Sequence, residues 1–258
     1  MKSNFVKTKN FKKFMSAMSS FGERGAEENR LIIVDGEPGL GKTTILQRWA
    51  TDNSCVYLRA KSDWTPRWFL EELLSAMKVQ LIPYTYEKRF NLALKELSER
   101  SIHADFADRQ FAVVIDEADF ITGRGQLVET IRDLADVGGV TFIIIGMGRI
   151  RDNLTRFPQA ASRVNGYVRF EPADLDDVKL FFAERCEIPI QDDLAEFILR
   201  ATTGFNRELL EAVKTVERFG FRAKLSDPQA GLSLKEMAGQ HLINDRRTGN
   251  PIKVPEVM

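Results

Sequence analysis

The chain has 258 residues, of which 43% are hydrophobic and 29% are charged, and its 37 basic and 37 acidic side chains give a formal net charge of zero. This length allows one α/β core with a small additional domain, and the balanced charge gives no general case for binding nucleic acid or an anionic membrane. No apolar run approaches the roughly 18 residues that a membrane-spanning helix needs. We therefore expect a cytoplasmic protein without a membrane partner.

Both ends of the chain are locally basic. Residues 1–13 contain five lysines and no acidic residue, and Arg246, Arg247 and Lys253 lie near the other end. Two interpretations stay open: solvated, disordered ends, or short patches that follow the phosphates of a nucleic acid.

Short runs rich in valine and isoleucine alternate with segments of helical periodicity from residue 31 to residue 170. This alternation is typical of an α/β protein with a parallel sheet that helices cover. The five predicted strands are residues 31–34, 56–58, 111–115, 141–145 and 167–170. Apolar stripes at helical spacing occupy residues 69–77, 90–97 and 127–135.

The pattern becomes wholly helical after residue 170. Helical periodicity covers residues 178–185, 194–202 and 208–219, which predicts a small helical lid. Glycines and prolines interrupt the pattern from residue 226 onward, so the sequence predicts one short helix near residues 234–243 and then an irregular tail.

A glycine-rich turn, GEPGLGKT, occupies residues 36–43, directly after the first predicted strand and before a helical segment. Such a turn points backbone N–H groups at a phosphate chain, and the positive end of the following helix adds to the attraction. Lys42 is expected to reach the β- and γ-phosphates, and the Thr43 hydroxyl to bind a magnesium ion. The predicted ATP site consists of Gly36, Glu37, Pro38, Gly39, Leu40, Gly41, Lys42, Thr43 and Thr44.

A second motif, FAVVIDEAD, ends the third predicted strand with two carboxylates. Asp116 is expected at the sheet edge where ligands bind, as a magnesium ligand together with Thr43. Glu117 is expected to orient or deprotonate the attacking water. The alternative for both residues is a solvated acidic turn.

These two motifs, followed by VTFIIIGMGRI and TGFNRELL in this order and spacing, resemble the AAA+ ATPases that serve DNA transposition, a group that includes phage Mu transposition protein B, TniB and TnsC. The resemblance covers about residues 8–218. It implies that Arg207 is a sensor 2 residue that touches the γ-phosphate. It also implies that Arg163 is an arginine finger for a neighbouring subunit, with Arg151 and Arg156 as rivals.

One position departs from the family pattern. Members usually carry a polar sensor 1 residue after the fourth strand, where this chain has Gly146, Met147 and Gly148. A methionine side chain cannot donate a hydrogen bond to water. We therefore predict slow hydrolysis, stimulated by DNA or a transposase.

DNA contacts are expected in the loop RAKSDWTPR after the second strand, where basic residues surround Trp64. In the related ATPases this loop and the one after the next helix follow DNA, which implies contacts from Lys61, Arg67, Thr85 and Lys88. The alternative is a solvated helix start in which Trp68, with or without Trp64, is buried.

The sequence therefore predicts a basic segment and helix (1–30), an AAA+ α/β nucleotide-binding core (31–171), a helical lid (172–222) and a partly irregular tail (223–258). The predicted function is an ATP-dependent regulator that assembles with copies of itself as a ring or filament on double-stranded DNA, without sequence specificity, and recruits or activates a transposase. The alternatives are a replication-initiation or helicase-loader ATPase, and a nucleotide-switched scaffold that binds proteins only.

Overall fold

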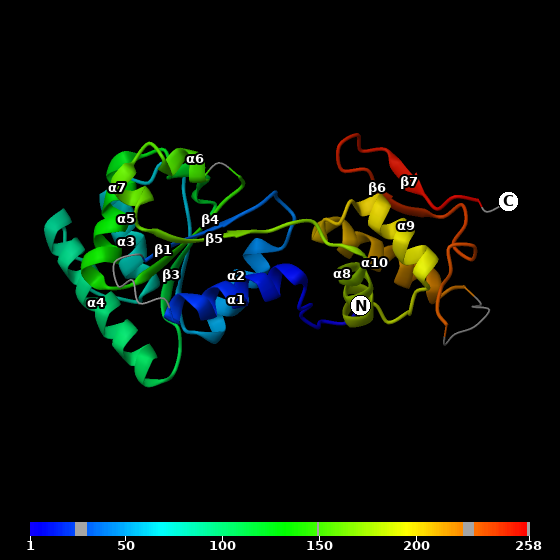
Figure 1. Cartoon of the computed structure of the whole chain (residues 1–258), viewed down its shortest axis with the longest axis horizontal. Coiled ribbons are helices and arrows are strands. Elements are labelled where there is room, and N and C mark those ends of the chain that lie inside the picture. Colours follow the sequence, from blue (N-terminus) through cyan, green and yellow to red (C-terminus); the bar gives the residue numbers. More distant parts are fainter. Residues whose placement is uncertain (24–29, 149, 224–229, 257–258) are drawn as a thin grey trace. The chain divides into compact units, whose positions relative to one another are not determined.

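A computed structural model describes residues 1–23, 30–148, 150–223 and 230–256 of the chain (Figure 1). It forms two compact units. The sheet unit comprises Phe14–Pro38 and Lys42–Phe170, and the helical unit comprises Met1–Lys13, Gly39–Gly41 and Glu171–Met258. No helix in the described ranges is both long and apolar enough to cross a membrane.

The sheet unit contains a five-stranded parallel sheet in the order β2-β3-β4-β1-β5. Its strands are β1 (Leu31–Asp35), β2 (Val56–Arg59), β3 (Ala112–Asp116), β4 (Thr141–Ile145) and β5 (Val164–Arg169). Every residue of β1 and β3 is buried, as expected for central strands that are covered on both faces. Because the strands are parallel, the residues that follow β1, β3 and β4 meet at one edge of the sheet.

Helices cover both faces of this sheet, α1 and α2 on one face and α3, α4 and α5 on the other (Figure 1). The helices are α1 (Lys9–Glu23), α2 (Lys42–Asp52), α3 (Pro66–Ala76), α4 (Tyr86–Phe106), α5 (Gly125–Gly138), α6 (Ile150–Leu154) and α7 (Pro158–Ala161), with a 3-10 turn, η1 (Ala118–Phe120). Phe14 of α1 is fully buried and meets Trp49 of α2 edge to face, with ring centres 5.5 Å apart. The predicted α/β fold class is confirmed.

The helical unit is built around α8 (Leu175–Arg185), α9 (Asp192–Thr202) and α10 (Asn206–Gly220), which share one apolar core. The N-terminal residues belong to the same unit. Asn10 and Glu171 exchange hydrogen bonds, and Lys9 forms ion pairs with Asp174 and Asp176. The expectation of a disordered N-terminal end is therefore wrong, while the interpretation of this segment as a patch that follows phosphates stays a prediction.

The short helix predicted near residues 234–243 is also wrong. Residues 234–239 form turns, and a two-stranded antiparallel hairpin follows, made of β6 (His241–Asn244) and β7 (Pro251–Lys253). Gly239 adopts φ 73°, a conformation that a helix does not allow, and its N–H donates to the carbonyl of Val254. The tail is thus ordered by pairing between residues 239–244 and 250–254 rather than by helical periodicity.

Candidate active site

The loop between β1 and α2 takes the shape that its glycines permit. Gly39 and Gly41 adopt φ values of 95° and 84°, which side chains other than glycine rarely tolerate. A Cβ at Gly41 would also lie 2.6 Å from Asn206 Nδ2 of the helical unit, to which residues 39–41 belong. Gly39 and Gly41 therefore allow a tight turn with no side chain at these two positions, so that a ligand can approach its backbone closely.

Lys42 begins α2, and its side chain is buried. Its Nζ donates to the carbonyl oxygens of Gly36 and Glu37, at 2.5 and 2.8 Å. Burial lowers the pKa of Lys42, and the nearby carboxylates of Asp35 and Asp116 oppose that shift. The amine is held inside the turn by neutral acceptors, where phosphate oxygens could replace them.

The two predicted magnesium ligands lie together in the sheet unit. Thr43 Oγ1 donates to Asp116 Oδ2 over 2.7 Å. The same carboxylate oxygen accepts a hydrogen bond from the Tyr57 hydroxyl, also over 2.7 Å, and burial raises the pKa of Tyr57. Tyr57 was not predicted from the sequence, because its only signal is its position on β2, the strand next to β3.

Glu117 is held by an arginine. It adopts a left-handed conformation (φ 55°, ψ 35°) just after β3, and its two carboxylate oxygens accept from Arg59 Nε and Nη2 at 2.8 and 2.6 Å. Arg59 ends β2 directly beside Asp116 in the strand register. The carboxylate predicted to act on water is therefore engaged in a two-point ion pair, a partner that the sequence did not indicate.

The side chain of Asp119, on η1, lies beside the sensor 1 position. A Cβ at Gly146 would lie 2.6 Å from Asp119 Oδ2 and 2.3 Å from Ile150 Cδ1, and the Met147 N–H donates to Asp119 Oδ2 over 2.8 Å. Burial raises the pKa of Asp119. A side chain at 146 would have to displace the side chains of Asp119 and Ile150, and Asp119 places a carboxylate beside this position that was not predicted from the sequence.

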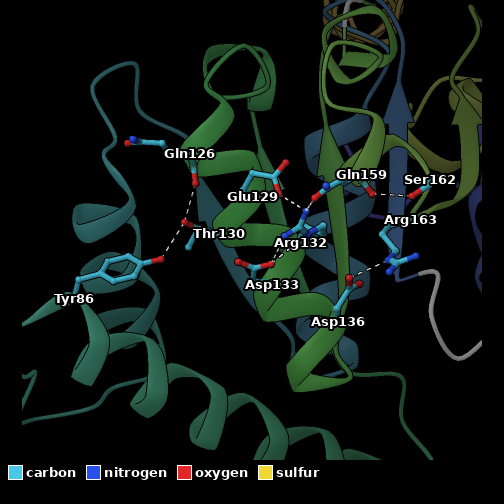
Figure 2. Close-up of polar contacts among 10 residues, drawn as sticks. All are labelled: Tyr86, Gln126, Glu129, Thr130, Arg132, Asp133, Asp136, Gln159, Ser162 and Arg163. Atoms are coloured by element: carbon cyan, nitrogen blue, oxygen red, sulfur yellow. Dashed lines mark hydrogen bonds and ion pairs between the residues drawn. The ribbon is translucent and has the colours of Figure 1, made fainter.

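Figure 2 shows the surroundings of Arg163, the predicted arginine finger. Arg163 Nε donates to Asp136 Oδ2 over 2.9 Å, and on the same helix α5 Arg132 forms ion pairs with Glu129 and Asp133. The rival Arg151 lies over the Tyr167 ring, 5.6 Å from its centre, and Arg156 is exposed. The face around Arg163 therefore alternates positive and negative side chains.

Arg207, the predicted sensor 2 residue, lies in the first turn of α10 with its side chain exposed. Within the helical unit its backbone N–H approaches the carbonyl of Gly39 at 3.4 Å, and Asn206 Nδ2 donates to the carbonyl of Leu40 over 3.2 Å. The start of α10 thus contacts the middle of the glycine-rich loop.

Part of the positive charge on the predicted DNA-binding residues is neutralised by an acidic neighbour. Lys61 pairs with Glu72 and lies 5.2 Å from the centre of the Trp68 ring, while Arg67 stacks 4.2 Å from the centre of the Tyr84 ring. Trp64 is buried, whereas Trp68 is partly exposed, so the expectation of a buried Trp68 is wrong. Thr85 and Lys88 are exposed at the start of α4, next to Glu87.

A strand, a glycine-rich phosphate turn with a buried lysine, and a second strand that ends in a carboxylate at the same sheet edge define a P-loop nucleoside triphosphatase. The family described as "AAA domain" matches residues 25–154, and the chain belongs to this family of ATPases. No curated protein sequence matches the chain.

Solved structures that resemble the chain include Cdc6p from Pyrobaculum aerophilum, with 15% identity and a TM-score of 0.59 over 85% of this chain and 65% of that one. The ORC2 protein of Aeropyrum pernix, solved as ADPNP and ADP complexes, has 13% identity and a TM-score of 0.60 over 85% and 66%. The ORC1 protein of Aeropyrum pernix, solved in complex with DNA, has 16% identity and a TM-score of 0.56 over 84% and 60%. The chain thus spans about two thirds or less of each of these proteins, and at these identities the likeness extends to the fold alone.

Proposed function

We propose that the chain binds ATP with Mg²⁺ on the loop of residues 36–44 and hydrolyses it. The Thr43 hydroxyl and the Asp116 carboxylate, 2.7 Å apart, are the hard oxygen donors that Mg²⁺ prefers, so the residues present fit this ion. When bound, Mg²⁺ neutralises charge on the β- and γ-phosphates. Lys42 binds the same phosphates, and Glu117 orients the attacking water.

The ion pair with Arg59 restrains hydrolysis in this proposal. The two hydrogen bonds from Arg59 occupy part of the acceptor capacity of both Glu117 oxygens and fix their orientation, so Glu117 orients water best when Arg59 releases it. Arg59 also begins the loop of residues 59–67, and a phosphate backbone that attracts Arg59 would free Glu117. Together with the absence of a polar side chain on residues 146–148 themselves, this geometry supports slow basal turnover that DNA stimulates.

Replacing Arg59 with alanine is expected to raise the basal ATPase rate about threefold, the factor that corresponds to the free energy of an exposed ion pair. The measurement is steady-state phosphate release without DNA. Arg48→Ala, which removes an exposed arginine of α2 that pairs with Asp52, is the matched control and is expected to leave the rate unchanged. A lower rate in Arg59→Ala would mean that Arg59 assists hydrolysis instead of restraining it.

On DNA, we propose that the chain acts as an ATP-controlled assembly factor of the replication-initiation or helicase-loader type. The observation that carries this proposal is the likeness of 84–85% of the chain to Cdc6p and ORC proteins, one of them solved in complex with DNA. The exposed cations at Arg59, Lys61 and Arg67 give the sheet unit a group that can contact phosphates.

A transposition regulator that recruits a transposase is the second candidate. The order and spacing of GEPGLGKT, VVIDEAD, VTFIIIGMGRI and TGFNRELL favour it. Both candidates require self-assembly, in which Arg163 would leave Asp136 and contact the nucleotide of a neighbouring copy while Arg207 contacts the γ-phosphate. Adding a replicative helicase or a transposase and asking which one stimulates hydrolysis distinguishes the two.

Reversing charge at both Lys61 and Arg67 (Lys61→Glu with Arg67→Glu) is expected to weaken duplex DNA binding at least tenfold and to lower the slope of log affinity against log salt by about 2. Fluorescence anisotropy of a labelled duplex, with ATP analogue or ADP and over a salt series, measures both quantities. Lys95→Glu, an exposed lysine of α4, is the matched control. Unchanged affinity and salt slope in the double variant would contradict the DNA contacts of Lys61 and Arg67. If the unaltered chain bound no DNA in any nucleotide state, the scaffold that binds proteins only would be the favoured function.

A further inference from the structure

A carboxylate from η1 lies beside the end of β4, where the chain itself carries no polar side chain. Asp119 belongs to η1, which follows β3, and Gly146 directly follows β4. β3 and β4 are neighbours in the sheet, so the segments that follow them meet at one edge. A Cβ at Gly146 would lie only 2.6 Å from Asp119 Oδ2. The carboxylate therefore occupies the space that a side chain at position 146 would need.

Backbone contacts hold Asp119 and the loop after β4 together. The Met147 N–H donates to Asp119 Oδ2 over 2.8 Å, and the Gly146 N–H donates to the carbonyl of Val34 in β1 over 3.0 Å. The loop is thus attached to η1 on one side and to β1 on the other. Asp119 is half-buried, so water can reach it. A carboxylate has about four acceptor positions, and the bonds from backbone N–H groups leave some of them for a water molecule.

Asp119 also lies close to the residue proposed to bind phosphate. Burial lowers the pKa of Lys42, and Asp119 is one of the carboxylates close enough to oppose that shift. Glu117 lies in the same turn after β3, with both oxygens bound by Arg59, whereas the contacts given for Asp119 are with backbone N–H groups. Two carboxylates thus follow β3 near the proposed phosphate site, and only Glu117 is engaged by an arginine in these contacts.

We propose that Asp119 is a second catalytic residue, whose carboxylate accepts a hydrogen bond from the attacking water and so replaces a sensor 1 side chain. The proposal rests on the proposed ATP site. A water molecule has two hydrogens, so one can point at Asp119 and the other at Glu117. The water oxygen then attacks the γ-phosphorus, its proton passes to Glu117, and the bond to the β–γ bridging oxygen breaks with release of ADP. Asp119 orients the water and takes no proton.

Steady-state phosphate release by the full chain, with ATP and Mg²⁺, tests this role. Asp119→Ala is expected to lower kcat about tenfold and to leave KM within about twofold, because one hydrogen bond to a charged group is lost in the chemical step. Asp119→Asn keeps an acceptor oxygen for the water and is expected to retain at least about a third of the rate. Asp105→Ala, which removes an exposed aspartate of α4, is the matched control and is expected to hydrolyse ATP as the unaltered chain does.

A binding measurement separates this role from a structural one. ADP with aluminium fluoride imitates the transferring phosphoryl group together with its attacking water, so it reports on contacts made in the transition state. Asp119→Ala is expected to bind fluorescent mant-ADP with aluminium fluoride about tenfold more weakly and to bind mant-ATP as the unaltered chain does. A residue that only anchors the Met147 N–H would weaken both ligands alike. Thermal unfolding without nucleotide checks that the variants fold.

Two results would overturn the role of Asp119 and leave the ATP site intact. The first is an Asp119→Ala variant that keeps both kcat and the affinity for mant-ADP with aluminium fluoride. The second is a loss of rate in Asp119→Asn as large as in Asp119→Ala, because an amide still accepts a hydrogen bond but takes no proton. Failure of the unaltered chain to bind mant-ATP would instead refute the ATP site itself.

Discussion

Lys42→Ala is expected to lose nucleotide binding and to lower kcat/KM for ATP hydrolysis by at least about 100-fold, the scale on which active sites depend on one preorganised charge. Lys42 Nζ is buried inside the phosphate turn, where its present acceptors are two backbone carbonyls. Mant-ATP titration and phosphate release measure the two effects.

Lys95→Ala controls for the loss of one lysine, because Lys95 is exposed on α4. It is expected to bind ATP as the unaltered chain does. Undiminished ATP affinity in Lys42→Ala would show that the glycine-rich turn is not the phosphate site, whatever its resemblance to one.

Glu117→Gln is expected to slow hydrolysis by about 10² to 10³ while ATP binding is retained, because an amide keeps the shape of the side chain but cannot accept a proton from water. Single-turnover phosphate release separates this chemical step from binding. If the variant hydrolysed ATP at the original rate, another carboxylate would have to act on the attacking water, and Asp119 on η1 is the candidate.

The double variant Arg59→Ala with Glu117→Gln completes a thermodynamic cycle with the Arg59→Ala prediction. If Arg59 acts only through Glu117, its removal changes nothing once Glu117 is an amide. An Arg59 effect of equal size in both backgrounds would mean that the two residues act independently.

The fold class could be predicted because its signals are local. Apolar runs of four or five residues mark the buried strands. In the turn GEPGLGKT, the positions of Gly39 and Gly41 predict where the backbone takes positive φ values. Thr43 and Asp116 also follow from local rules, since Thr43 lies in the first turn of α2 after β1 and Asp116 ends β3 at the same sheet edge.

The remaining features depend on contacts between distant segments. Tyr57 and Arg59 reach Asp116 and Glu117 only because β2 is the neighbour of β3 in a particular register, and strand order cannot be read from one sequence. Lys9 donates a hydrogen bond to Asp174, which lies 165 positions later in the sequence. The spacing of Leu234 and Met237 suits a helix as well as a turn, and pairing of β6 with β7 decides against the helix.

The Arg59 and Glu117 pair has a consequence for how this ATPase should be assayed. Arg59 is largely exposed, so dissolved ions compete with the pair, and the Debye length falls from about 30 Å at 0.01 M salt to about 10 Å at 0.1 M. A stimulation factor is a stimulated rate divided by the basal rate, and in the proposed mechanism this ion pair limits the basal rate. A fold-activation by DNA or by a protein partner is then a property of the chain together with its buffer, and values obtained at different ionic strengths are not comparable until both rates are given separately.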